Sequence, residues 1–166
     1  MKKRIAAAGL VALCAWPALC AARVWVGADV GLAGGAFSQA SPIGVYGGLS
    51  TRSLPVGIEL GYQAYSANPG KVGLFTATAL YRAPIPRVAG LHFLARAGIA
   101  HVTSGAGAFA RASTRPIIGA GVSYHVLRNV NIRAEYDLVI DPRVAGGPSE
   151  NGDQLLVGAT YHFPGT

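Results

Sequence analysis

Five charged side chains stand at alternate positions in stretches that are otherwise apolar or small. Glu59 and Arg96 lie in two separate stretches, and Arg133, Glu135 and Asp137 occupy every second position of a third. Alternate residues of a β-strand point to one face, so the last three side chains share a face. An unpaired buried charge is very costly, which favours ion pairs on such a face. We therefore expect a charge network in which Glu59 pairs with Arg96 or Arg133, with a proton or ion path as the alternative.

Three histidines fall on the same kind of polar face near the ends of their stretches. His92, His125 and His162 are at the level of Arg52 and Arg82. Such a group is compatible with a pH sensor or a metal site. No carboxylate shares this level, and the stretches of His92 and His162 are not neighbours in the chain. We therefore expect scattered polar residues at a rim and no metal site.

Eight alternating segments must position these side chains. The last, residues 154–163, shows the pattern most clearly, because one face carries Leu155, Val157, Ala159, Tyr161 and Phe163. The segments are residues 24–32, 43–52, 56–65, 72–82, 91–102, 117–126, 130–140 and 154–163. A tilted β-strand of this length crosses a bilayer. We expect an all-β fold, an eight-stranded antiparallel up-and-down transmembrane β-barrel, with the charges inside and the apolar faces outside.

The N-terminus has the features of a secretory signal peptide. A basic start at residues 1–4 precedes an apolar run at residues 5–16, Pro17 breaks the run, and small residues follow. We expect cleavage after Ala22, with Cys20 as the alternative site. The domains are then a signal peptide at residues 1–22 and a barrel at residues 23–166. Both cysteines leave with the signal, so no disulfide remains.

The composition favours a membrane barrel over a soluble domain. Hydrophobic residues make up 51% of the chain and charged residues 13%, and Lys71 is the only lysine after the signal. A soluble surface normally carries many lysines and glutamates. The chain beyond the signal has no unbroken apolar run of 18 residues, so no helix of it would span a bilayer. It has no cluster of basic residues that would bind nucleic acid.

The connections and the aromatic residues define an orientation. Short connections alternate with longer ones at residues 33–42, 66–71, 103–116 and 141–153, which is typical of barrels whose long loops lie outside the cell. We then expect two aromatic girdles at the two membrane interfaces. The girdle residues are Tyr62 and Phe75 at the outer level and Tyr81, Phe93, Tyr124, Tyr161 and Phe163 at the periplasmic level. Trp25 points inward at the lower rim.

Several strand sequences resemble those of a known family. Residues 119–124, 131–137 and 158–163, which read GAGVSY, NIRAEYD and GATYHF, resemble the last three strands of the OmpA/OmpX-type small eight-stranded outer-membrane β-barrel family, and residues 94–98 resemble its fifth strand. The resemblance implies a Gram-negative outer membrane as the location. It implies outer-membrane lipids including lipopolysaccharide, and the barrel-assembly machinery, as partners.

Neither of two possible catalytic pairs is complete. Outer-membrane lipid A deacylases use a His-x-Ser pair with a carboxylate, whereas this chain has Ser123 two residues before His125, and His101 two residues before Thr103. A catalytic base needs a third group to orient it, and neither pair has one. We expect no catalytic residue, cofactor or metal. The expected function is a non-enzymatic structural or surface-interaction, adhesion-like role through the outer loops. A narrow pore is the alternative, and a lipid-modifying enzyme is third.

Overall fold

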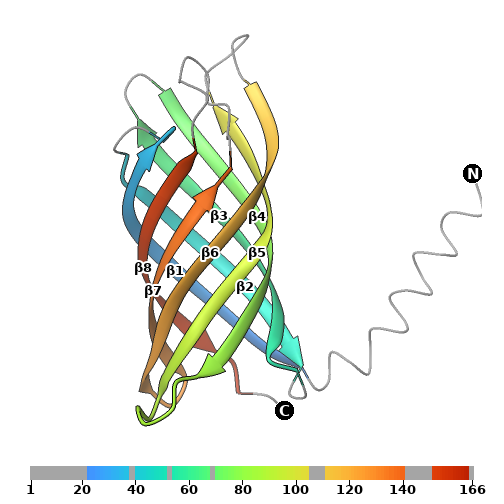
Figure 1. Cartoon of the computed structure of the whole chain (residues 1–166), viewed down its shortest axis with the longest axis vertical. Helices are drawn as coiled ribbons and strands as arrows, with labels where there is room; N and C mark the ends of the chain where they lie inside the picture. Colours follow the sequence, from blue (N-terminus) through green and yellow to red (C-terminus); the bar gives the residue numbers. More distant parts are fainter. Residues whose placement is uncertain are drawn as a thin grey trace, which may run out of the picture.

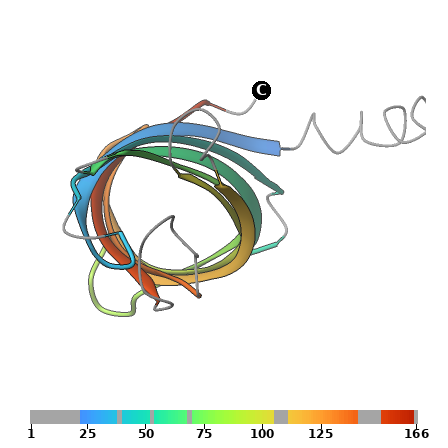
Figure 2. The same ribbon diagram turned by 90° about the horizontal axis from the view of Figure 1, so that it is seen from above.

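The computed structural model describes residues 22–37, 40–51, 54–67, 70–104, 111–140 and 151–164. These residues form β1 (Ala22–Gly35), β2 (Pro42–Thr51), β3 (Val56–Ala67), β4 (Gly70–Pro84), β5 (Leu91–Ser104), β6 (Arg111–Leu127), β7 (Val130–Val139) and β8 (Gly152–His162). Each strand pairs antiparallel with its neighbours in the chain, and β1 pairs with β8. Figure 1 shows the strands inclined to the long axis, and Figure 2 shows the closed ring. The predicted eight-stranded antiparallel up-and-down barrel is confirmed.

The two ends of the barrel differ in the connections that they carry. We call the end with Ala22 and Phe163 the terminal end, which is at the bottom of Figure 1, and the opposite end the loop end. β2 and β3, β4 and β5, and β6 and β7 are connected at the terminal end. The remaining connections are at the loop end. Residues 1–21 lie outside the described part of the chain, as does Arg52.

The two faces of the barrel wall have different chemistry. Along β8, Leu155 and Val157 are 49% and 48% exposed on the outside, whereas Gln154 and Leu156 are buried in the lumen. The same alternation runs through the other strands. A continuous outward apolar face is stable against lipid chains and not against water. In the described part of the chain, no helix is long and apolar enough to cross a bilayer.

Some strands are longer than the sequence pattern predicts. Residues 103–116 were expected to form a loop, but β5 continues to Ser104 and β6 begins at Arg111, with Ser104 paired to Arg111. The loop prediction is therefore wrong for the two ends of this segment. The reason is physical: at this level Thr103 and Thr114 point outward, so the alternation of apolar residues that marks a strand in lipid is missing. The segment 66–71 is likewise mostly strand, because β3 ends at Ala67 and β4 begins at Gly70.

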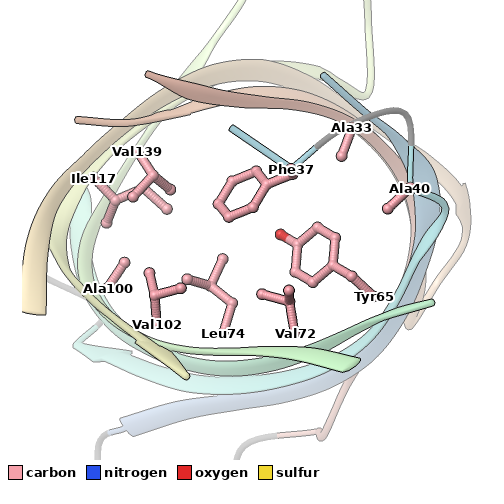
Figure 3. Packing of buried hydrophobic residues seen from close by; sticks show 10 residues of the cluster. All are labelled: Ala33, Phe37, Ala40, Tyr65, Val72, Leu74, Ala100, Val102, Ile117 and Val139. Atoms are coloured by element: carbon pink, nitrogen blue, oxygen red, sulfur yellow. The ribbon is translucent and has the colours of Figure 1, made fainter. Parts of the chain in front are cut away.

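Apolar side chains also close the lumen on both sides of the charged residues, which the alternation did not predict. Near the loop end, ten buried residues form one cluster, in which the rings of Phe37 and Tyr65 stack at 4.9 Å (Figure 3). Near the terminal end, Trp25, Tyr46, Leu80 and Leu94 form a second cluster. We call these the upper plug and the lower plug. The charged side chains lie between them, so the lumen is layered along its axis.

Glycines leave the space that the large inward side chains occupy. The indole of Trp25 lies over Gly48, where a Cβ atom would come within 2.6 Å of the indole carbon Cε2 and 2.5 Å of the carbonyl oxygen of Ile58. Gly47, one residue earlier, faces outward, and the nearest atom to a Cβ there would be the carbonyl oxygen of Trp25 at 3.3 Å. A methyl group added at Gly48 tests the packing of the lower plug, and a methyl group added at Gly47 serves as its control.

We expect Gly48→Ala to destabilise the barrel by about 1–3 kcal/mol, because a methyl group added to a filled space displaces the indole or the neighbouring strand. Gly47→Ala is the matched control and should change the stability much less. Urea-dependent unfolding of a chain that begins at Arg23, followed by the fluorescence of Trp25, measures both variants. Equal stability of the two variants would show that the lower plug is loosely packed.

Candidate functional site

The centre of the lumen is built around the carboxylate of Glu59. Arg133 donates to both of its oxygens, from Nη1 to Oε2 at 2.8 Å and from Nη2 to Oε1 at 3.1 Å. The indole Nε1 of Trp25 donates to Oε2 at 3.1 Å. Both charged groups are buried, with 2% of the Glu59 side chain and 3% of the Arg133 side chain exposed. This two-point contact combines charge attraction with a fixed geometry.

Arg96 connects the other carboxylates to this pair. Its Nη1 lies 3.4 Å from Glu59 Oε1 and 3.4 Å from Glu135 Oε2, and its Nη2 lies 2.9 Å from Asp137 Oδ2. Arg133 also contacts Glu135 at 3.0 Å. The structure therefore brings together all five charged residues of the expected network, from β3, β5 and β7. Glu59 contacts both arginines that were alternatives for its partner, Arg96 and Arg133.

Aromatic and amide side chains hold the network from both sides. The guanidinium carbon of Arg133 lies 3.5 Å from the ring centroid of Tyr46, a cation–π contact. The Tyr46 hydroxyl is fixed in turn by the hydroxyl of Thr160 at 2.7 Å. On the loop side, Gln154 Nε2 donates to Asp137 Oδ2 at 3.0 Å, and the Tyr65 hydroxyl bonds to Gln154 Oε1. Hydrogen bonds thus run from the charges into the upper plug.

A fourth buried carboxylate belongs to the same region. Asp29 on β1 is 4% exposed, and its Oδ1 atom has no hydrogen-bond partner among the described residues. The network expected from the sequence contains no residue of the first segment. The sequence pattern that marks an inward charge was present, because Asp29 lies among Val26, Ala28 and Val30 as Glu59 lies among its own apolar neighbours. The layer accordingly holds four carboxylates and two arginines.

The three histidines of the rim lie closer together than expected. The ring centroids of His92 and His125 are 5.1 Å apart, and those of His125 and His162 are 6.5 Å apart and nearly parallel. The expectation of scattered rim residues is therefore wrong. The physical reason is the narrow lumen, which brings side chains from non-neighbouring strands together. Asn131 on β7 lies at the same level, and its Nδ2 is 3.1 Å from His162 Nε2. No group of three potential metal ligands is found in the described residues.

The rim histidines line a cavity of about 770 Å³ that opens at the terminal end. We call it the vestibule. Three arginines and three histidines line it: Arg23, Arg82 and Arg128, with His92, His125 and His162. Trp25 and Leu80 of the lower plug form part of its lining and separate it from the charge network.

Neither sequence-based catalytic pair forms a working arrangement among the described residues. Ser123 is buried, and its hydroxyl has no hydrogen-bond partner, while His125 Nδ1 lies 3.4 Å from the carbonyl oxygen of Gly90. His101 is exposed, and its Nδ1 lies 3.0 Å from the hydroxyl of Thr114 on β6. Thr103 donates to the carbonyl oxygen of Gly73 instead. Among the described residues, no carboxylate contacts either histidine.

The aromatic residues expected at the interfaces all point outward. They are between 41% and 51% exposed: Tyr62, Phe75, Tyr81, Phe93, Tyr124, Tyr161 and Phe163. Tyr62 and Phe75 are register partners on β3 and β4, and Tyr161 and Phe163 meet edge to face at 5.2 Å near the terminal end. Tyr136 is a further exposed tyrosine, whose hydroxyl donates to Asp153 at 3.2 Å.

Comparisons with known proteins identify the fold. No family model matches the chain, and no curated protein matches its sequence. Among solved structures, Neisserial surface protein A is 17% identical with a TM-score of 0.66, over 86% of this chain and 97% of that one. The N-terminal β-barrel domain of Pseudomonas aeruginosa OprF is 23% identical with a TM-score of 0.65, over 85% and 97%.

Two further matches represent different activities on the same fold. Ail, the attachment invasion locus protein of Yersinia pestis, in complex with the heparin analogue sucrose octasulfate, is 15% identical with a TM-score of 0.52, over 86% of this chain and 97% of that one. The outer membrane enzyme PagL is 13% identical with a TM-score of 0.52, over 82% and 98%. The chain thus has the fold of the small eight-stranded outer-membrane barrels, and surface proteins and an enzyme share that fold.

Removal of the central carboxylate tests the network. We expect Glu59→Ala to destabilise the barrel by about 3–5 kcal/mol, because it leaves buried arginines without their partner. In double-mutant cycles, the coupling of Glu59 to Arg133 should exceed its coupling to Arg96, since Arg133 makes two shorter contacts. Unfolding in urea measures each variant. An absence of coupling to both arginines would rule out the network as a source of stability.

Proposed function

We propose that this protein is a non-enzymatic outer-membrane barrel with a structural or surface-interaction role, and that the loop end makes the contacts. The observation that carries the proposal is the filled lumen. The upper plug, the charge layer and the lower plug follow one another along the axis. A lumen closed by these three layers supports neither a wide channel nor a reaction in its middle, so we assign the surface contacts to the loop end.

The outward face supports a location in the outer membrane. Large apolar side chains cover it, and the fold is that of outer-membrane barrels. The proposed orientation places the terminal end in the periplasm, because a signal peptide at residues 1–22 would deliver Arg23 there. Lipopolysaccharide and other outer-membrane lipids would then contact the outer half of the wall, and the barrel-assembly machinery would insert the chain.

The loop end has the form of a rigid support for loops. β5 and β6 remain paired as far as Ser104 and Arg111, beyond the level of Ile99, which is the last large apolar residue on the outside of β5. Above it on this outer face, His101, Thr103 and Thr114 are polar and exposed. Binding residues are often placed on loops that a rigid scaffold holds. The segment 105–110 between β5 and β6 and the segment 141–150 between β7 and β8 lie outside the described residues.

A sulfated sugar is a suitable first ligand to test. Ail, which shares the fold, was solved with a heparin analogue. On this chain the loop-end segments include Lys71, Arg111 and Arg143. The two alternatives have less support. A narrow pore would have to pass two plugs and a charge layer, and an enzyme would need a third group beside His101 and Thr114.

The closed lumen predicts a small electrical signal. In planar bilayers the purified barrel should give no steady, porin-sized current, because an ion would have to separate the buried pairs between Glu59 and the two arginines. Brief events of low conductance are compatible with rare rearrangement of the charges. A steady large current would overturn the closed-lumen account and favour the pore.

A loop exchange separates surface interaction from the other functions. Replacement of residues 105–110 and 141–150 with short glycine-serine turns should leave the barrel folded, as judged by a gel shift between unheated and boiled samples. Binding of expressing cells to a heparin-coated surface, and to other candidate surfaces, should fall. A Glu59→Gln variant that folds should bind as the native protein does. Unchanged binding after the loop exchange would contradict the proposal.

A further inference from the structure

The vestibule at the terminal end has a charge pattern that neither the barrel's stability nor the proposed surface role requires. Its volume of about 770 Å³ is within the usual range for small-molecule sites. Residues from seven strands, from the β2–β3 and β6–β7 turns and from the segment after β8 line it, and among the described residues no aspartate or glutamate does so. An uncompensated group of cations in a concave site attracts anions.

The arginines of the vestibule are available for a ligand. Arg82 is partly buried; its guanidinium carbon lies 5.9 Å from the Trp25 ring centroid, and no carboxylate of the described residues is within ion-pair distance. Arg23 and Arg128 are exposed, and neither makes an ion pair with another described residue. Glu59 does not line the vestibule, and its carboxylate accepts hydrogen bonds from the Trp25 indole and from Arg133.

The histidines add donors that face the same space. The ring of His125 lies 5.1 Å from that of His92 and 6.5 Å from that of His162, and all three residues line the vestibule. Ser50 and Asn129 also line the cavity and supply further hydrogen-bonding groups.

We infer that the vestibule is a binding site for a phosphate-bearing group. A single carboxylate is satisfied by one arginine fork, whereas this cavity presents arginines from β1, β4 and the β6–β7 turn together with imidazole donors. Phosphate oxygens accept several such donors at once, and arginine recognises them with two parallel bonds. The phosphate belongs either to a soluble periplasmic compound or to the headgroup of a lipid at the inner leaflet. The site does not depend on the proposed role of the loops.

The test is a calorimetric titration of the folded full barrel, in a neutral detergent and a buffer without phosphate or sulfate, with inorganic pyrophosphate as the probe. We expect saturable binding. Arg82→Gln combined with Arg128→Gln should weaken it at least about tenfold, because the variant loses two charged donors that bond phosphate oxygens. The matched control is Arg87→Gln, an exposed residue at the same end that does not line the vestibule. It should change the affinity by less than about twofold.

Competition with short-chain phosphatidylglycerol distinguishes the two sources of phosphate. Displacement of pyrophosphate by the lipid would assign the site to a headgroup, and pyrophosphate binding that the lipid does not displace would assign it to a soluble compound. A gel shift between unheated and boiled samples shows that each variant is folded, and Arg128→Gln alone, in an exposed turn, provides a variant with little effect on folding. Absence of saturable pyrophosphate binding, or equal loss in the Arg87→Gln control, would overturn the inference.

Discussion

Closure of β1 onto β8 is the constraint on which the rest of the structure depends. The two strands pair without interruption from Trp25 and His162 to Gly35 and Gly152. In lipid no water is available to satisfy a free backbone donor or acceptor, so a sheet can cross a membrane only when it has no edge. Closure with eight strands also fixes a narrow lumen, which side chains are just able to fill. The identity of every inward residue is therefore a packing problem.

The lumen solves this problem in layers. Apolar and aromatic side chains close both ends, and Glu59, with the arginines that contact it, occupies the middle. Burial makes each of these charges dependent on its partners, because neither water nor a counter-ion can easily replace them. Gly48 on the neighbouring strand β2 leaves room for Trp25, so the indole can both fill the lower plug and donate to Glu59. The same indole separates the network from the cations of the vestibule.

Much of this architecture could be predicted from the sequence, because a strand in lipid has to show apolar residues at every second position. That rule identified eight strands and the inward direction of Glu59, Arg96 and Arg133. It failed where the surroundings are not lipid. We expected this strand to begin at residue 117, but β6 begins at Arg111. Its first residues lie beyond the apolar belt, where polar outward residues such as Thr114 are stable, so the sequence there shows no alternation of apolar residues.

Inside the barrel the rule is also silent, since an inward position accepts either polar or apolar residues. Leu74 and Leu94 therefore gave no sign that they would form plugs. The clustering of His92, His125 and His162 depends on ring orientations across the lumen, which strand order does not determine. Asp29 was visible in the pattern, and its place beside the network follows from closure of β1 onto the far end of the sheet.

The most direct test of the central claim is whether water-soluble reagents reach the middle of the lumen. The chain beyond Cys20 has no cysteine, so a single thiol can be introduced at Thr78, which is buried and is the register partner of Glu59. Leu54→Cys, at an exposed position between β2 and β3, provides the reference rate. In the folded barrel a charged methanethiosulfonate reagent should label Leu54→Cys rapidly and Thr78→Cys only after unfolding. Equal labelling rates in the folded state would contradict a lumen sealed by paired charges and plugs.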